Sequence, residues 1–221
     1  MHMLQEHWLF AEWDSHELGA LNALTRRETL PDATQLFAEG DPTPGLHLVL
    51  RGAIKIYTLD GCGRERIISL IGPGQFCGEM GVVDSAPSSA WGETHGETEL
   101  LIIPADAFKH AMLTSPGICL KVCRVLSARL RRADALLSDM TWRNARQRVL
   151  RGLLRLAEAA PDGSGRFPVR MTHQELAGLL GTARETVSRV LADLQERGLL
   201  VSRERSWHVP SLAALQREIV D

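Results

Sequence analysis

The sequence of 221 residues is long enough for one large domain or two modest ones, and its 44% of apolar and 24% of charged residues are typical of a soluble globular protein. It contains no run of about 18 consecutive apolar residues, so we predict no membrane span. Residues 1–13 lack the basic start and small-residue cleavage site of a signal peptide, which indicates a cytoplasmic protein.

The formal charge of −2 is distributed unevenly along the chain. Residues 1–139 contain 12 Lys and Arg against 18 Asp and Glu, a balance of −6. Residues 140–221 contain 13 Arg and no Lys against 9 Asp and Glu, a balance of +4. This asymmetry indicates two regions with different tasks, of which the basic one faces a polyanion. The alternative is a chance asymmetry of surface charge.

Residues 34–103 have the pattern of short strands separated by turns. Apolar or alternating runs occupy residues 46–50, 53–59, 67–71 and 100–103, with Gly, Pro and Asp between them. Short strands at intervals of roughly 8–12 residues are typical of a jelly roll. We therefore predict an α+β protein whose first domain, residues 1–114, is a double-stranded β-helix of the jelly-roll type.

Residues 105–157 are predicted to be helical. A short helix over residues 105–113 precedes a long one, which begins near Pro116 and carries apolar residues at every third or fourth position as far as Met140. The cationic residues are predicted to lie on the opposite face: Lys121, Arg124, Arg129, Arg131 and Arg132. Such a stripe packs either on its own domain or against a second copy of itself. We favour pairing, so residues 115–141 are predicted to be the dimerisation helix of a homodimer.

Residues 171–200 have the pattern of two short helices joined by a tight turn. Thr172 and Glu175 are spaced as a capping box that begins one helix, and Thr182 and Glu185 are spaced as a second box. Gly181, between them, can take the positive φ that a tight turn requires. The residues spaced to pack the two helices together are Leu176, Ala177, Leu180, Val187 and Val190. This pattern predicts a helix-turn-helix within a DNA-binding domain over residues 142–221.

The second of these helices is predicted to read DNA. Arg184 and Arg189 can each donate two hydrogen bonds to guanine, and Glu185 can accept one from cytosine. A hairpin over residues 199–209 would form a wing whose tip either meets phosphates or is simply solvated. The predicted DNA-binding residues are Thr172, Thr182, Arg184, Glu185, Thr186, Ser188, Arg189, Arg203 and Arg205. The alternative is a helical hairpin whose arginines are solvated and whose Glu185 only caps the helix.

Five stretches of the sequence together resemble a known family. Residues 37–41 read FAEGD and residues 46–52 read LHLVLRG, which is similar to the entry strands of a cyclic-nucleotide-binding β-roll. Residues 74–81 read GQFCGEMG and residues 88–91 read SSAW, which resembles the phosphate-binding cassette of that roll. Residues 181–189 read GTARETVSR, which resembles a recognition helix. On these stretches the chain resembles the CRP/FNR family of bacterial transcriptional regulators.

The resemblance implies a sequence-specific regulator of transcription that binds duplex DNA. A β-roll sensor, a dimerisation helix and a winged helix-turn-helix would follow one another in that order. The dimer would bind two palindromic half-sites about one helical turn apart. Arg184, Glu185 and Arg189 resemble the set for a TGTGA-like half-site, and Ser188 admits a TTGA-like one. The resemblance also implies that the loop over residues 157–170 contacts RNA polymerase.

The resemblance also implies an effector pocket in the roll. Gly78 and Glu79 match the residues that hold a phosphate and a ribose hydroxyl, although Glu79 could instead be a structural cap. The arginine that neutralises the phosphate of cyclic AMP would fall at Ser88, and no Arg or Lys lies between Arg66 and Lys109. We therefore expect a small effector other than cyclic AMP, or none. The expected pocket residues are Gly78, Glu79, Met80, Ser88, Ser89, Asp134 and Leu137.

Other functions are not favoured by the sequence. A haem held by Cys77 would need a histidine nearby, and only His47 and His95 are available as candidates. We find no nucleophile–base arrangement and no metal-spaced cluster, so we predict neither catalytic nor metal-binding residues, and we expect Cys119 and Cys123 to be buried thiols. The alternative function is a ligand-binding regulatory module that acts on a protein partner through a degenerate helix-turn-helix.

Overall fold

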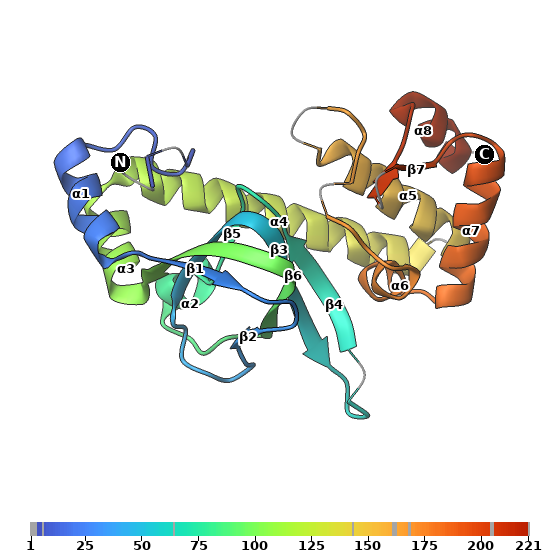
Figure 1. Ribbon diagram of the computed structural model, residues 1–221. Coiled ribbons are helices and arrows are strands. Elements are labelled where there is room, and N and C mark those ends of the chain that lie inside the picture. Colours follow the sequence, from blue (N-terminus) through green and yellow to red (C-terminus); the bar gives the residue numbers. More distant parts are fainter. Residues whose placement is uncertain are drawn as a thin grey trace. The chain divides into compact units, whose positions relative to one another are not determined.

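The computed structural model describes residues 4–5, 7–63, 65–142, 144–160, 163–167, 169–203 and 206–220. The chain divides into two units, of which the first contains Met1–Thr58 and Ser69–Ala133 and the second contains Leu59–Ile68 and Asp134–Asp221. In Figure 1 the long strands lie in the blue-to-green part of the chain, and the yellow-to-red part is mostly helical.

The strands of the N-terminal half form one sheet. They are β1 (Arg26–Leu30), β2 (Gln35–Phe37), β3 (Gly45–Leu59), β4 (Glu65–Ile71), β5 (Phe76–Cys77) and β6 (Trp91–Pro104). Their order is β1-β6-β3-β4, with β2 also paired to β6 and β5 to β3. The predicted α+β class, with an N-terminal β domain, a long helix and a C-terminal helix-turn-helix, is confirmed.

Strand β3 is one long strand where the sequence predicted two. Its pairing with β6 shifts register between Val49 and Ala53, and Gly52 in this stretch has a φ of 78°. A Cβ at Gly52 would lie 2.5 Å from the carbonyl oxygen of Glu97. The hydroxyl of Thr98 donates to the Ala53 carbonyl at 3.0 Å, which satisfies that group inside the irregular stretch. Gly52 therefore marks a bulge within a strand and not a turn between two strands.

The core of the first unit combines the strands with helices and the N-terminal segment. The helices are α1 (Ser15–Leu24), α2 (Glu79–Asp84), α3 (Ala105–Thr114) and α4 (Pro116–Trp142). Leu4, Leu9 and Phe10, which precede α1, are buried in the same cluster as Phe76 and Phe108. The N-terminal segment is therefore a part of the core.

No single helix among the described residues is long and apolar enough to cross a membrane. Helix α3 and the first part of α4 meet that criterion only as a pair bent by 111°. Phe108, Ile118 and Val122 of this pair are buried in the core of the first unit.

Helix α4 carries apolar residues on two different faces. Ile118 and Val122 are buried in the core of the first unit. Leu120, Leu130 and Leu137 are 53%, 64% and 64% exposed. At about 100° per residue these leucines lie roughly 100–200° around the helix from Ile118. Packing on the protein's own domain uses one face of the helix, and the exposed leucines lie on another, so the two predicted ways of packing do not exclude each other.

The second unit is built around a helix that contacts three others. Its elements are α5 (Ala145–Glu158), α6 (His173–Leu180), α7 (Arg184–Glu196), β7 (Val201–Arg203), β8 (Ser206–His208) and α8 (Leu212–Val220). Helix α5 packs against α6, α7 and α8. A Cβ at Gly152 of α5 would lie 2.1 Å from Cδ2 of Leu180 of α6, so the close approach of these two helices requires a glycine.

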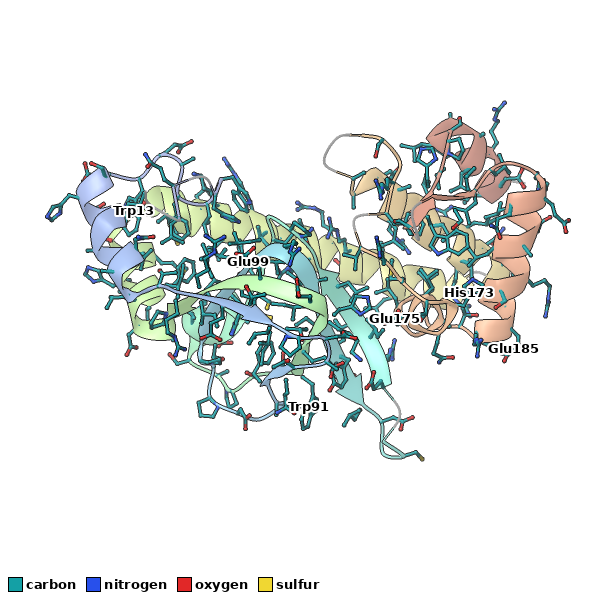
Figure 2. The ribbon with its side chains drawn as sticks, viewed as in Figure 1. Trp13, Trp91, Glu99, His173, Glu175 and Glu185 are labelled. Carbon is teal, nitrogen blue, oxygen red and sulfur yellow. The ribbon has the colours of Figure 1, made fainter. Side chains whose placement is uncertain are left out.

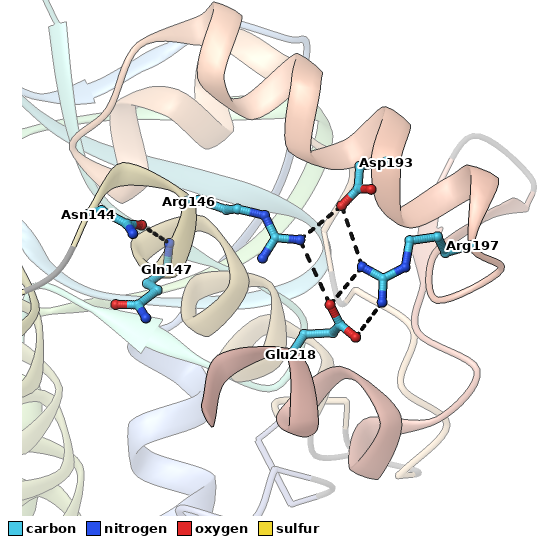
Figure 3. A network of polar contacts seen from close by, with 6 residues as sticks. All are labelled: Asn144, Arg146, Gln147, Asp193, Arg197 and Glu218. Carbon is cyan, nitrogen blue, oxygen red and sulfur yellow. Dashed lines mark hydrogen bonds and ion pairs between the residues drawn. The ribbon is translucent and has the colours of Figure 1, made fainter. Parts of the chain in front are cut away.

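A network of ion pairs joins α5, α7 and α8 (Figure 3). Arg146 donates to Asp193 at 3.0 Å, and Arg197 donates to both carboxylate oxygens of Glu218. These hydrogen bonds from Arg197 hold the pKa of Glu218 below its usual value. The positive charges of Arg146 and Arg197 are therefore paired with the carboxylates of Asp193 and Glu218.

Candidate functional site

The turn between α6 and α7 is formed as the sequence predicted. The backbone N–H of Glu175 donates to the hydroxyl of Thr172 at 3.2 Å, and the Thr172 N–H donates to the Glu175 carboxylate at 2.7 Å. These two hydrogen bonds form the first capping box. Gly181 ends α6 in the left-handed region with φ 59° and ψ 46°, which a glycine adopts without strain.

Helix α7 begins one residue later than predicted. Its N-cap is Ala183, in an extended conformation, and no side chain caps the helix. The N–H groups of Thr186 and Val187 donate to the carbonyl of Ala183 at 3.1 and 3.2 Å. The third helical position is therefore Thr186 and not Glu185. The predicted second capping box is wrong because Ala183, and not the hydroxyl-bearing residue before it, occupies the cap position.

Helix α7 has one buried and one outward face. The buried residues are Val187, Val190, Leu191 and Leu194, each at most 5% exposed. Arg184, Glu185 and Arg189 are exposed, and Thr182, Thr186 and Ser188 are half-buried. Figure 2 labels Glu185 at the start of α7, and His173 and Glu175 on α6. The predicted reading residues of α7 therefore share the face that does not pack against the unit's own core.

Ser188 has a partner that the sequence did not predict. Its hydroxyl lies 2.9 Å from Nδ1 of His173, the first residue of α6. The ring of His173 lies 5.9 Å, between centroids, from the ring of Trp207 in β8. Three elements of the second unit thus meet at His173.

The remaining predicted DNA-binding residues lie at the edges of this site. Thr172 is exposed and caps α6. Strands β7 and β8 pair antiparallel as the predicted wing, with Val201 opposite His208. Arg203 ends β7, but its side chain lies outside the described part of the structure, and so does the whole of Arg205.

The cassette of the β-roll is held together by close backbone contacts. Gly78 is the N-cap of α2 with a φ of 93°, and a Cβ there would lie 2.1 Å from the carbonyl oxygen of Gly45. A Cβ at Gly81 would lie 1.8 Å from Oγ1 of Thr43. These glycines are therefore needed for packing, whatever else the segment binds.

Glu79 is a buried carboxylate paired with an arginine from α4. It is 1% exposed, and Nη1 of Arg129 donates to its Oε1 while Nη2 donates to the carbonyl of Phe76. Burial raises the pKa of Glu79, and the adjacent guanidinium counteracts part of this effect. Its second oxygen, Oε2, is buried without a hydrogen-bond partner among the described residues. A hydrogen-bond donor brought to Oε2 would satisfy it.

The position of Arg129 differs from the sequence prediction, which put it on the solvated face of α4. Arg129 follows Val122 by seven residues and Ile118 by eleven, so it lies within about 20° of Ile118 on the buried face. This spacing from Val122 and Ile118 could have predicted from the sequence that Arg129 lies on the buried face of α4. The pairing also supplies a positive charge beside Glu79 that the cassette segment itself lacks.

The other predicted pocket residues are more exposed than Glu79. Met80 is 52% exposed, and Ser89, Asp134 and Leu137 are exposed. Ser88 is half-buried, and its backbone N–H donates to the Asp41 carbonyl at 2.8 Å.

A second cation reaches the cassette from α3. Lys109 donates from Nζ to the hydroxyl of Ser85 at 3.0 Å, in an exposed contact. In the cassette, the buried Oε2 of Glu79 can accept a hydrogen bond from a hydroxyl group, because it has no partner among the described residues. Position 88 carries no cation that could pair with a phosphate, and its backbone N–H already donates to the Asp41 carbonyl.

The buried groups next to the cassette are held neutral. Burial lowers the pKa of His47 to about 4 and raises the pKa of Cys77 to about 12.

Cys119 is half-buried and Cys123 is exposed, so the prediction of buried thiols is wrong for Cys123, which lies on the outward face of α4. Among the described residues no three His, Cys, Asp or Glu side chains are grouped so that they could hold a metal ion.

Family models match each part of the chain. Residues 27–115 match a cyclic nucleotide-binding domain, and residues 147–218 match a Crp-like helix-turn-helix domain. A nucleotide-sensing roll followed by a DNA-reading helix-turn-helix defines the class of effector-controlled transcriptional regulators.

Individual relatives agree with this class. The chain is 32% identical to the CRP-like cAMP-activated global transcriptional regulator of Mycobacterium tuberculosis, over 82% of this chain and 84% of the relative. It is 36% identical to the cyclic AMP receptor protein of Thermus thermophilus, over 79% of each chain. The solved c-di-GMP responsive global regulator CLP of Xanthomonas campestris is 28% identical, with a TM-score of 0.69 over 90% of this chain and 100% of the other. The chain therefore belongs to the CRP/FNR family of DNA-binding transcriptional regulators.

Proposed function

We propose that the protein acts as a homodimer whose two α7 helices read the half-sites of a palindromic duplex, and that a small effector bound at Glu79 controls this binding. The observation that carries the proposal is the division of α7 into two faces. One face packs on the core of the second unit, and the other presents Arg184, Glu185 and Arg189 outward.

The outward face of α7 has the chemistry to read base edges in the major groove. Arg184 and Arg189 can donate bidentate hydrogen bonds to guanine, and Glu185 can accept from the amino group of cytosine. Within the described residues neither arginine forms an ion pair, in contrast to Arg146 and Arg197. We therefore propose TGTGA-like half-sites, with TTGA-like half-sites as the variant in which Ser188 takes part.

The second face of α4 supports the proposed dimer. Leu120, Leu130 and Leu137 expose apolar surface at spacings of ten and seven residues, which suit a helix that pairs with its own copy. Two copies paired in parallel would present two α7 helices, as two half-sites one helical turn apart require.

The effector is proposed to present a hydroxyl to Oε2 of Glu79. This oxygen is a buried acceptor without a partner among the described residues, and it lies beside the cation of Arg129. Relatives named for different nucleotides, cyclic AMP and c-di-GMP, show that the family does not fix the ligand. Because position 88 lacks the phosphate-binding cation, we propose an effector other than cyclic AMP, whose binding repacks α4 and re-aims the α7 helices.

Three further expectations belong to this proposal. The loop over residues 157–170 would contact RNA polymerase, and the protein would act in the cytoplasm, where bacterial DNA is located. It would have no catalytic activity of its own, in keeping with relatives that are regulators and not enzymes. A regulatory module that acts only on a protein partner is disfavoured, because it would not need the outward arginines of α7.

Selection of a randomised duplex pool by the purified protein tests the proposal. The selection is run at one fixed salt concentration, without ligand and with cyclic AMP, cyclic GMP or c-di-GMP. We expect a palindromic motif with a TGTGA- or TTGA-like half-site, and no enhancement by cyclic AMP. A motif that depends on cyclic AMP would overturn the proposal about the effector but keep the DNA-reading function. No enrichment under any condition would overturn the DNA-reading function and favour the protein-partner alternative.

A further inference from the structure

The hydrogen bond between His173 and Ser188 lies where the two helices of the helix-turn-helix meet. Ser188 belongs to the outward half of α7, next to Arg189, and is half-buried. His173 is the first residue of α6, directly after its N-cap. The Nδ1–Oγ distance of 2.9 Å is that of a well-formed hydrogen bond. A side chain on the non-reading helix therefore holds a hydroxyl of the reading helix.

Trp207 limits how the ring of His173 can move. The two ring centroids are 5.9 Å apart, with planes tilted by 36°. Trp207 is itself fixed in the wing, because its carbonyl accepts from the Phe167 N–H at 2.9 Å and its residue pairs with Ser202. The imidazole thus lies between β8 and α7 and offers Ser188 a partner in a defined position.

The chemistry of a hydroxyl makes this partner consequential for base reading. A serine hydroxyl has one proton to donate and two lone pairs that accept. If Nδ1 of His173 accepts that proton, Ser188 can only accept from DNA, as from the amino groups of adenine or cytosine. If Nδ1 carries a proton, it donates to Ser188, whose own proton is then available for guanine, for thymine O4 or for a phosphate. The histidine therefore sets whether Ser188 acts as a donor or an acceptor.

We propose that His173 is a specificity-determining positioning residue, which sets the base preference of Ser188 without touching the base itself. This inference rests on the proposed function, because it assumes that α7 lies in the major groove. It assigns a role in recognition to a residue that lies outside the reading helix and that the sequence did not single out.

Three variants separate the hydrogen bond from the ring contact. His173→Phe keeps a ring next to Trp207 but cannot bond to Ser188. His173→Asn places an amide close to the position of Nδ1, so it can restore the hydrogen bond without the ring. Ser188→Ala removes the hydroxyl, and the double variant His173→Phe/Ser188→Ala tests whether the two residues act as one unit.

The experiment is selection from the randomised duplex pool with each variant, together with titration of one specific and one random duplex over a range of salt. We expect His173→Phe to change the preference at one position per half-site, by about 2- to 10-fold, the worth of one hydrogen bond. Ser188→Ala should change the same position, the double variant should match Ser188→Ala, and His173→Asn should restore part of the preference. Affinity for random duplex and its salt dependence should not change in His173→Phe or in His173→Asn.

Several outcomes would overturn the inference. A preference in His173→Phe that equals the wild-type preference means that Ser188 reads without help. An equal loss at every position means that His173 only stabilises the fold, and a reduced salt slope means that it binds a phosphate directly. If the wild-type protein itself selects no motif, the proposed function fails and the inference fails with it. If the wild type and all variants select the same motif with the same preference, only the inference fails.

Discussion

Arg129 on α4 donates a hydrogen bond through Nη1 to the buried carboxylate of Glu79 on α2. Replacement of Arg129 by alanine would leave that carboxylate buried without its cation. We expect a loss of ~2–4 kcal/mol in the free energy of unfolding, somewhat below the value for a fully buried pair because the Arg129 side chain is 33% exposed. Urea unfolding at neutral pH measures the loss.

A double variant serves as the control for this ion pair. Glu79→Gln removes the buried charge, so Arg129→Ala should cost much less in that background than in the wild type. Equal costs in the two backgrounds would mean that Arg129 stabilises the fold through its contact with Phe76 and not through Glu79.

His47 should make the stability depend on pH. Its pKa is lowered by burial from 6.5 to about 4, so the unfolded chain takes up a proton at a higher pH than the folded protein does. Stability is then lost as the pH falls from 6.5 through about 4, and the full loss is about 3 kcal/mol. Unfolding curves at pH 7 and pH 4 measure the loss. The free energy of unfolding should fall more between these two pH values in the wild type than in His47→Gln. Parallel pH dependence in the two proteins would contradict the prediction.

Gly152 should not tolerate a side chain. A Cβ would lie 2.1 Å from Cδ2 of Leu180, which is buried between α5 and α6. We expect Gly152→Ala to destabilise the second unit by roughly 1–3 kcal/mol through overpacking, reduced by the better helix propensity of alanine. Gly117→Ala in α4 is the matched control, because its Cβ would meet only Oγ of Ser115 at 3.8 Å. Thermal unfolding of both variants tests the difference, and equal stability of the two would refute it.

Leu130 should contribute to the dimer. It is 64% exposed on the outward face of α4, so a charge there costs a single chain little but would be buried between two copies. We expect Leu130→Glu to shift the protein to the monomer in analytical ultracentrifugation and to weaken binding to a two-half-site duplex. Leu113→Glu, at a leucine of α3 that is 78% exposed, should leave both unchanged. A dimeric Leu130→Glu protein would rule out this face as the interface.

Arg189 should discriminate between bases. Its replacement by alanine should weaken specific DNA by ~1–3 kcal/mol and relax the base preference, while random duplex is affected less. Arg197→Ala, at the other end of α7, should leave the preference intact because Arg197 is held by Glu218 and Asp193. Parallel titrations of specific and random duplexes measure both effects. Equal weakening of the two duplexes by Arg189→Ala would show that Arg189 contacts only the backbone of DNA.

Local patterns in the sequence were sufficient for the architecture and for the reading helix. The strand and helix periodicities, the Thr172–Glu175 capping box and Gly181 all act between residues close in the chain, so spacing alone predicts them. The start of α7 was missed by one residue, because Thr182 and Ala183 compete for the same cap and the geometry of the turn decides between them.

Contacts between distant segments were decided only by the tertiary structure. Arg129 and Glu79 are fifty residues apart, and His173 and Ser188 are fifteen apart on different helices. Composition and periodicity report which face of a helix is apolar, but they do not report which side chain from another element meets it. The Arg129–Glu79 and His173–Ser188 pairs therefore arise from packing, since a buried carboxylate or a half-buried hydroxyl takes its partner from whatever the fold brings within hydrogen-bond distance.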